Sequence, residues 1–194
     1  MKNYKKNLKI LQDAHVYSKE MEHDACGVGL IASTEGKKSR KVVEYGINAL
    51  KAVWHRGAVD ADGKTGDGAG IRLEIPSDFF TEKIELTGHK HDGSDICVGM
   101  IFLPRNNYSA QENSRTLVES ELTKSNFSIY GWRQVPVNPK VLGEKANLTR
   151  PEITQVLFKH NDKTLTGKDL ERKIYESRRK IEKESIKNAN EGFY

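Results

Sequence analysis

The sequence predicts an α+β fold in which layers of β-sheet are covered by helices. Segments with the two-residue period of strands alternate with segments of helical period along most of the 194 residues. Short turns between several of the expected strands favour antiparallel pairing in parts of the sheet. Hydrophobic residues make up 36% and charged residues 30% of the chain, a composition typical of a soluble globular protein rather than a disordered one.

The N-terminal part begins with a polar, lysine-rich segment at residues 1–25 that lacks the apolar core of a signal peptide. We interpret it as a removable leader; an ordinary mobile tail is the alternative. Residues 27–33 are predicted to form a strand. Ser39 is placed to cap a helix that stops near Gly57. The apolar face of this helix carries Val43, Ile47, Leu50 and Trp54.

The elements expected after this helix are a glycine-rich loop (62–70), a strand (71–75), a short helix from 77 or 78, a strand (96–103), a helix (109–124), a strand (127–135), a loop (136–151), a strand (153–158) and a helix (166–188). Ser109 and Thr166 each open a capping box. Residues 96–103 are apolar nearly throughout, so this strand is expected to be buried on both faces. It contains Cys97, which is predicted to be an unreactive core cysteine. Phe193 and Tyr194 are predicted to open a further strand, so we expect the chain to be a fragment.

Composition and charge exclude several classes of protein. The net charge is +5, but the basic residues between 168 and 187 alternate with acidic ones. The sequence contains no basic stripe with interleaved aromatic residues, so nucleic-acid binding is not predicted. No apolar run is long enough to span a membrane. Two cysteines form no disulfide framework and, without a signal peptide, indicate a cytoplasmic protein. Residues 89–92 hold two histidines and an aspartate, but a solvated loop is favoured over a metal site.

Cys26 is the candidate nucleophile. It stands in the segment 24–32, DACGVGLIA, where a polar stretch ends and an apolar strand begins. A free thiol has a pKa of roughly 8.5 and needs a base, and an α-amino group with a pKa of about 7.7–8.0 is a suitable one. Removal of residues 1–25 would free that amine on Cys26 itself. The glycines of 27–32 also match the dinucleotide-binding pattern, but no strand precedes them and no helix follows directly.

Further motifs follow Cys26 in a fixed order. They are His55–Ala58 (HRGA), Thr65–Gly70 (TGDGAG), Ile71–Phe80, Val98–Arg105, Gly131–Pro136, Val141–Glu144 and Gly192–Tyr194. Together with Glu22–Leu30 they resemble the class II glutamine amidotransferase domain of glutamate synthase large subunits. The resemblance covers nearly the whole chain after residue 25.

The resemblance implies the fold and the roles of the site residues. It implies the four-layer αββα sandwich of N-terminal nucleophile hydrolases, incomplete at the C-terminus, with a leader at 1–25 and the truncated amidotransferase domain at 26–194. Cys26 would be the nucleophile, and Arg56 and Gly57 would organise the site. A loop close to the substrate would be formed by Gly66, Asp67, Gly68, Ala69 and Gly70. Asp67 is expected to bond backbone amides rather than to act as an acid.

The resemblance also implies a reaction and partners. Glutamine would be hydrolysed to glutamate and ammonia through a Cys26 thioester, and the ammonia would pass to 2-oxoglutarate at a flavin. FMN and an iron–sulfur cluster are expected in other segments of the same polypeptide, with a small NAD(P)H-oxidising subunit as partner. No cofactor or metal is expected on these 194 residues. The family's arginine for the substrate carboxylate, its Asn-Gly oxyanion pair and its aspartate for the substrate amine are expected beyond Tyr194, so the 194-residue polypeptide alone is predicted to be inactive.

Three alternatives stay open at this point. The chain could belong to another class II amidotransferase that supplies ammonia to a different acceptor. It could also be a non-catalytic interaction domain of the same fold, in which Cys26 serves only packing. Finally, His55 could form a Cys–His dyad with Cys26, although its position at a helix end beside Arg56 argues for a simpler role near the helix dipole.

Overall fold

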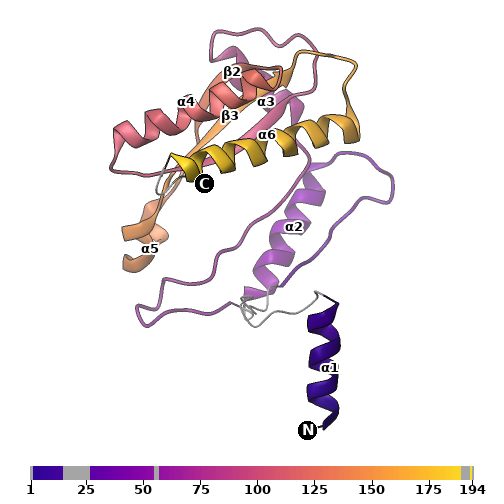
Figure 1. Cartoon of the computed structure of the whole chain (residues 1–194), viewed down its shortest axis with the longest axis vertical. Helices are drawn as coiled ribbons and strands as arrows, with labels where there is room; N and C mark the ends of the chain where they lie inside the picture. Colours follow the sequence, from indigo (N-terminus) through magenta and orange to yellow (C-terminus); the bar gives the residue numbers. More distant parts are fainter. Residues whose placement is uncertain (1, 15–26, 55–56, 189–192, 194) are drawn as a thin grey trace. The chain divides into compact units, whose positions relative to one another are not determined.

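The computed structural model describes residues 2–14, 27–54, 57–188 and 193 (Figure 1). They form two compact units. The first is built from the described residues of 1–58 and 68–71, and the second from those of 59–67 and 72–194.

The first unit contains helices α1 (Lys2–Asp13) and α2 (Arg40–Ala52). The Ser39 hydroxyl accepts a hydrogen bond from the backbone N–H of Lys41 at 3.2 Å, which confirms the predicted cap. Helix α2 ends before the predicted stop at Gly57, and the Trp54 side chain is 80% exposed. Trp54 therefore lies beyond the end of α2, and the prediction that it belongs to the apolar face of this helix is wrong.

Two predicted strands, 27–33 and 71–75, are not formed among the described residues. Both segments have the apolar content of strands, yet Val28 and Leu30 are almost fully exposed. A strand needs a partner for its backbone N–H and C=O groups, and no described segment supplies one here.

The second unit contains a three-stranded sheet of β1 (Cys97–Leu103), β2 (Phe127–Gln134) and β3 (Glu152–His160). The spatial order is β1-β3-β2, and β3 is antiparallel to both neighbours. The chain passes from β1 through helix α4 (Tyr108–Lys124) to β2 and leaves a gap that β3 fills, the split β-α-β arrangement. All three strands were predicted within two residues of their observed ends.

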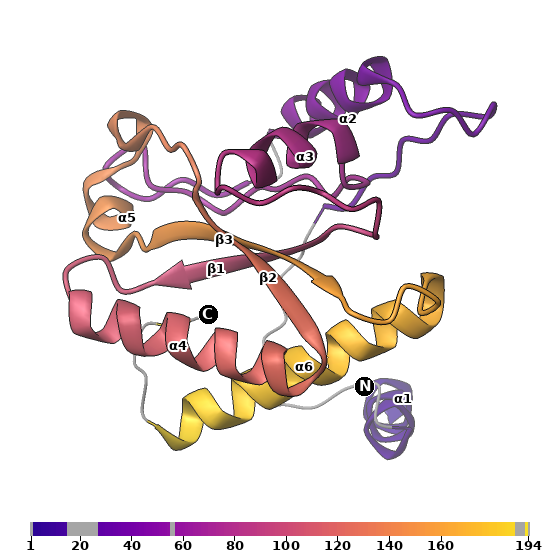
Figure 2. The ribbon, with the colours of Figure 1, turned by 90° about the horizontal axis from the view of Figure 1, so that it is seen from above.

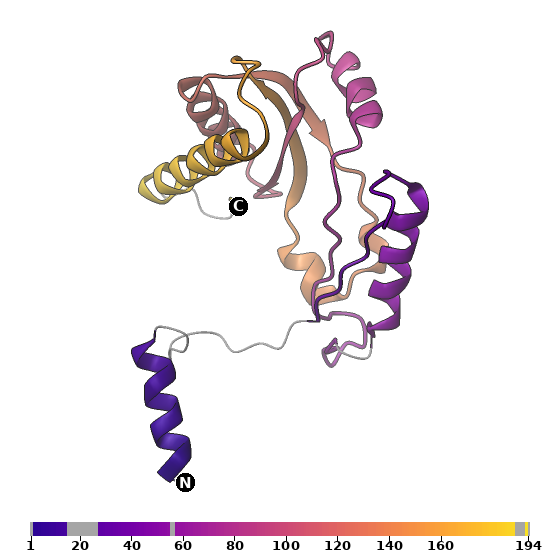
Figure 3. The ribbon, with the colours of Figure 1, turned by 90° about the vertical axis from the view of Figure 1, so that its right-hand side faces the viewer.

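Helices cover both faces of this sheet (Figure 2). Helices α4 and α6 (Gly167–Lys187) lie on one face, and helix α3 (Ser77–Glu85) lies on the other, as the edge-on view of the sheet also shows (Figure 3). The core on the α4/α6 face consists of Cys97, Val118, Leu122, Phe127, Val156, Phe158 and Leu170. The smaller core on the α3 face consists of Phe80, Ile84, Tyr130 and Leu157.

Strand β3 is buried on both faces because successive residues point to opposite sides of the sheet. Val156 and Phe158 belong to one core and Leu157 to the other. Burial on both faces was predicted for the segment of β1, and that prediction is only partly right. Cys97 and Leu103 are buried, but Met100 in the middle of the strand is 46% exposed, since β1 lies at the edge of the described sheet.

The starts of the long helices differ from the predicted capping boxes. Helix α4 is capped by Asn107, whose Oδ1 accepts from the N–H of Ala110 at 3.0 Å, and not by Ser109. Thr166 does precede α6 but makes no side-chain capping bond. The predicted loop 136–151 contains a 3-10 turn, η2 (Pro139–Val141), and helix α5 (Glu144–Thr149).

A bulge in β2 ties the sheet to the loop after α3. The pairing register shifts between Ile129 and Gly131, so Tyr130 is the extra residue. The Thr87 hydroxyl donates a hydrogen bond to the Tyr130 carbonyl at 2.8 Å. Gly131 has φ of 149°, and a Cβ there would lie 2.8 Å from Cγ2 of Thr87, so glycine suits this position for two reasons.

Trp132 and Phe193 pack against the core on the α4/α6 face. The Trp132 indole also donates a hydrogen bond to Glu119 Oε1 at 2.6 Å. The strand predicted to open at Phe193 and Tyr194 extends into residues outside those described. Within the described helices, none combines the length and the apolar character that crossing a membrane requires.

Candidate functional site

The predicted nucleophile Cys26 and the predicted site residue Arg56 lie outside the described residues, as do His23 and His55. The structure therefore describes the site through the segments that flank them. These are the chain after Cys26, Gly57 after Arg56, and the glycine-rich loop.

The segment after Cys26 has free space beside the α-carbons of Gly27 and Gly29. A Cβ added at Gly27 or Gly29 would meet no atom within 4 Å in the described structure. Gly27 and Gly29 are thus not explained by crowding from described residues. Close approach of a substrate to this backbone stays a prediction.

Gly57 closes a turn after α2. Its backbone N–H donates to the Trp54 carbonyl at 3.1 Å, and the residue is exposed. A Cβ at Gly57 would lie 3.4 Å from that carbonyl oxygen, an ordinary contact. Gly57 therefore continues the chain out of the helix without strain.

A bridged loop connects the HRGA and TGDGAG motifs. Val59, two residues after Gly57, forms an isolated antiparallel bridge with Gly66. Within this loop the Asp60 N–H donates to the Thr65 carbonyl at 2.6 Å, and the Gly63 N–H donates to the Asp60 carbonyl at 2.9 Å. Residues 59 and 60 therefore meet Thr65 and Gly66, the first two residues of the TGDGAG motif, at the base of one hairpin-like loop.

Asp62 holds this loop in shape. One carboxylate oxygen accepts from the N–H groups of Lys64 at 2.9 Å and Thr65 at 2.7 Å, and the other accepts from the Thr65 hydroxyl at 2.5 Å. These bonds favour the charged form and lower the pKa of Asp62 to about 2, with the Thr65 hydroxyl as the largest cause. Asp62 was not among the predicted site residues, although an aspartate three residues before a threonine in a glycine-rich stretch is a recognisable turn signal.

The loop is backed by the start of helix α5. A Cβ on Gly143 would clash with Asp62 Oδ2, Thr65 Oγ1 and the Thr65 backbone nitrogen. Lys145 Nζ lies 2.7 Å from Asp60 Oδ2 and adds an ion pair between helix and loop. Gly143 belongs to a motif noted in the sequence, and the structure gives a reason for glycine there.

The predicted substrate loop Gly66–Gly70 continues directly from the bridge. These residues are exposed, and a Cβ on Gly68 or Gly70 would meet no described atom within 4 Å. Asp67 has an interaction in the structure, but a catalytic or amide-bonding role for it stays a prediction. Exposed glycines at the end of a braced loop can bring backbone N–H groups close to a bound ligand.

The polar segment 89–92 serves the fold. Asp92 pairs with Lys159 at 2.6 Å and Lys163 at 3.0 Å and accepts from the Tyr130 hydroxyl at 3.3 Å. The hydrogen bond from Lys159 is the main reason why the pKa of Asp92 falls well below its usual range. His91 contacts the Ser94 carbonyl at 2.8 Å. Among the described residues no group of three or more histidine, cysteine or acidic side chains could hold a metal ion.

Cys97 is a buried cysteine. Its side chain lies in the core on the α4/α6 face, and burial raises the pKa of its thiol to about 12. At neutral pH it carries essentially no thiolate. The prediction of a buried cysteine is confirmed, and its lack of reactivity stays a prediction.

Comparison with known proteins identifies a family for residues 26–194, which match the model of class II glutamine amidotransferases. The matched range begins at Cys26. The chain is 51% identical over 181 residues to the glutamate synthase [NADPH] large chain of Azospirillum brasilense, covering 93% of this chain and 12% of that protein.

Two further relatives agree. The ferredoxin-dependent glutamate synthase of Pyropia yezoensis is 37% identical over 176 residues, which cover 90% of this chain and 11% of the relative. The glutamate synthase [NADPH] large chain of Bacillus subtilis is 34% identical over 174 residues, which cover 86% and 11% respectively. The chain thus spans only about a tenth of the length of the curated relatives it matches.

Proposed function

The chain belongs to the class II glutamine amidotransferases, and from that premise we propose that it is the glutamine-hydrolysing part of a glutamate synthase large subunit. The observation that carries the proposal is the match of residues 26–194, which starts at the cysteine, together with 51% identity to the Azospirillum brasilense large chain.

The proposed reaction uses Cys26 as nucleophile. Its sulfur attacks the side-chain carbonyl carbon of glutamine and forms a tetrahedral oxyanion. The C–N bond then breaks, the nitrogen takes a proton and leaves as ammonia, and a thioester remains. Water attacks the thioester, which releases glutamate and restores the thiol.

The proposed base is the α-amino group of Cys26. A peptide nitrogen cannot accept the thiol proton, so residues 1–25 have to be removed before the reaction. An α-amino pKa of about 7.7–8.0 lies close to working pH and suits both uptake of the thiol proton and its return to the leaving nitrogen. The position of Cys26 at the first residue of the family match supports this division of the chain.

Arg56 and Gly57 are proposed to organise the site, and the loop from Gly66 to Gly70 to border the substrate. The Val59–Gly66 bridge and the Asp62 hydrogen bonds support this, because they give a defined shape to the loop that follows Arg56 and Gly57 in the sequence. The complete amidotransferase domain is proposed to form the four-layer αββα sandwich of N-terminal nucleophile hydrolases. Ile71 Cδ1 lies 3.0 Å from the position that a Cβ on Gly46 of α2 would take, and this close packing of a helix on an apolar residue supports a helix layer of such a sandwich.

The remaining parts of the activity are proposed to lie in other segments of the full polypeptide. The 194 residues contain no Asn-Gly pair, the oxyanion donor that the family resemblance leads us to expect. Loss of one such donor costs about 10²–10³ in rate, so we expect no measurable ammonia release from this polypeptide alone. Transfer of ammonia to 2-oxoglutarate, the FMN and iron–sulfur chemistry and a small NAD(P)H-oxidising subunit complete the proposal.

An electrophilic glutamine analogue tests the proposal. It is applied to a polypeptide that extends through the segments named above, and the modified residue is located by mass spectrometry. We expect a single adduct on an N-terminal Cys26, lost in Cys26→Ser and retained in Cys97→Ala, which removes the only other cysteine of the 194 residues.

Two outcomes would contradict the proposal. One is a folded, extended protein that takes up no label, which would favour an interaction domain of the same fold. The other is a mature enzyme that retains Met1 and still releases ammonia from glutamine.

A further inference from the structure

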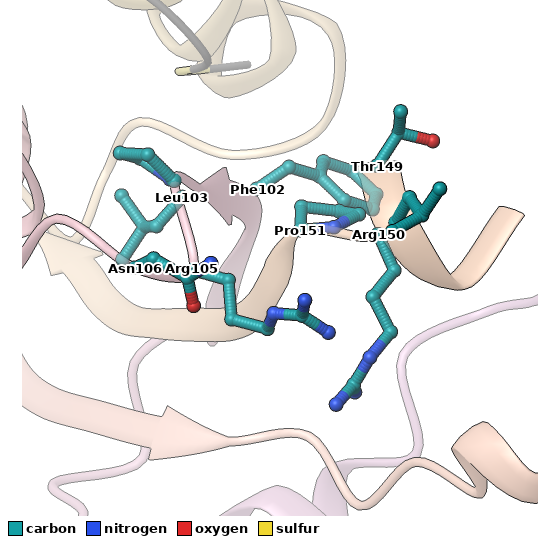
Figure 4. A pocket seen from close by; sticks show the side chains of 9 residues that line it. Phe102, Leu103, Arg105, Asn106, Thr149, Arg150 and Pro151 are labelled. Carbon is teal, nitrogen blue, oxygen red and sulfur yellow. The ribbon is translucent and has the colours of Figure 1, made fainter. Parts of the chain in front are cut away.

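A cavity of about 590 Å³ opens in the second unit at the end of the sheet where β1 stops and β3 begins. Its walls come from the turn after β1, residues 102–106, and from the connection between α5 and β3, residues 148–151 (Figure 4). Leu103 and Glu152 are paired across the two strands, so the turn and the connection meet at the same end of the sheet. None of the residues of the proposed glutaminase site lines this cavity.

Two arginines dominate the polar side of the cavity. Figure 4 shows the guanidinium groups of Arg105 and Arg150 extending from the two wall segments into the same open space. Neither forms an ion pair with a described residue, whereas Arg115, Arg178 and Arg179 on the helices each pair with a glutamate. Two unneutralised cations facing one cavity favour an anionic ligand.

The Nε atom of Arg150 is buried, unlike the end of its side chain that faces the cavity. Its Nε is enclosed by protein and has no hydrogen-bond partner. A buried N–H without an acceptor is destabilising, and such groups are rare in folded proteins. Because Nε itself is enclosed by protein, an oxyanion in the cavity would bond the terminal Nη groups of this guanidinium.

The rest of the wall is apolar. Phe102, Pro104, Leu148 and Pro151 contribute rings and a methyl-bearing side chain beside the two arginines. A compact anion such as phosphate would satisfy the charges but leave this surface without contacts. A ligand with two carboxylates joined by a short hydrocarbon chain matches both the charges and the apolar wall.

We propose that Arg105 and Arg150 form a binding site for a small aliphatic dicarboxylate. Each guanidinium binds one carboxylate through paired N–H···O hydrogen bonds, and the hydrocarbon chain lies against the apolar wall. This site goes beyond the proposed glutaminase activity and uses different residues, so failure of one leaves the other intact.

Calorimetric titration of glutarate into the full 194-residue chain, and into the longer polypeptide that carries it, tests the proposal. We expect saturable binding at an ionic strength that screens nonspecific charge effects. Arg105→Gln and Arg150→Gln are each expected to weaken binding at least about tenfold, since each removes one charge-assisted bidentate pair. Butyrate, which keeps the hydrocarbon chain and lacks one carboxylate, is expected to bind at least about tenfold more weakly than glutarate.

Arg172→Gln is the matched control, because Arg172 is exposed on α6 away from the cavity lining. It removes the same charge and is expected to leave glutarate binding unchanged. Thermal unfolding of each variant checks that the fold is intact. The proposal is overturned if folded wild-type protein does not bind glutarate saturably, if Arg172→Gln weakens binding as much as the cavity variants, or if inorganic phosphate binds more tightly than glutarate.

Discussion

Replacing Gly99 with alanine tests how closely β1 approaches β3. Gly99 lies directly opposite Val156 in the antiparallel ladder. A Cβ at this position would lie 2.8 Å from Cγ1 of Val156 and 3.7 Å from Cε1 of Phe158. Val156 is 1% exposed, and its β-branched side chain has little rotational freedom, so it cannot move aside without disturbing the core.

The size of the effect follows from this contact. The 2.8 Å separation is about 0.6 Å shorter than the lower limit of ordinary van der Waals contact. Overpacking of a core costs about 1–3 kcal/mol, and the reduced flexibility of the unfolded chain returns about 0.4–1 kcal/mol. The midpoints leave a net loss of about 1.3 kcal/mol, which corresponds to a fall of roughly 3–5 °C in Tm for a chain of this length.

Thermal and urea unfolding followed by circular dichroism measure the change. Gly29→Ala is the control, because a Cβ there meets nothing within 4 Å and it should leave the stability of the sheet unchanged. In a double-mutant cycle, Val156→Ala should relieve much of the loss caused by Gly99→Ala, because it removes the clashing methyl group. An alanine variant at Gly99 at least as stable as wild type, or additive effects in the cycle, would refute the reasoning.

Three further outcomes are expected. Cys97 should not react with a thiol reagent in the folded protein at pH 8, because burial raises its pKa to about 12. In urea the same thiol should react fully. Rapid labelling of the folded protein would contradict the burial of Cys97. Asp92→Asn should lower Tm at pH 7. Because the pKa of Asp92 is lower in the folded than in the unfolded state, the difference in Tm from wild type should shrink as pH falls below the unfolded-state pKa of about 3.9. A difference in Tm that is independent of pH would show that the charge of Asp92 contributes nothing. Gly143→Ala should speed amide hydrogen exchange at Thr65, measured by NMR, because the added Cβ would clash with Asp62 and Thr65. A local overpacking cost of about 1–3 kcal/mol corresponds to exchange that is roughly 5- to 150-fold faster. Unchanged exchange would show that α5 does not support the loop.

Local patterns in the sequence predicted the second unit well. The strands β1, β2 and β3 and the helices α3, α4 and α6 follow from periodicity, because each has an apolar face that meets a neighbour in the structure. Helix α5 was missed because it has only six residues, too few to show a helical period. Asn107 replaced Ser109 as the cap of α4, since several residues before this helix can accept the same hydrogen bond.

The segments 27–33 and 71–75 show the limit of such patterns. A strand is completed by hydrogen bonds to a partner distant in sequence, and local alternation does not identify that partner. The same limit applies to the site. The chemistry of Cys26 could be derived from the residue type and its setting, whereas the brace that Asp62 and Gly143 give to the loop depends on a contact between residues about 80 positions apart.

The order of strands has a consequence for synthesis of the protein. Both β1 and β2 bond to β3 within the described sheet, and β3 is the last of the three to leave the ribosome. Until residue 160 has emerged, the nascent chain carries two unpaired edges, one of them the segment CVGMIFL, whose apolar and β-branched content favours intermolecular association. A polypeptide that stops before residue 152 is therefore expected to collect in insoluble form, whereas one that continues past residue 160 can close the sheet.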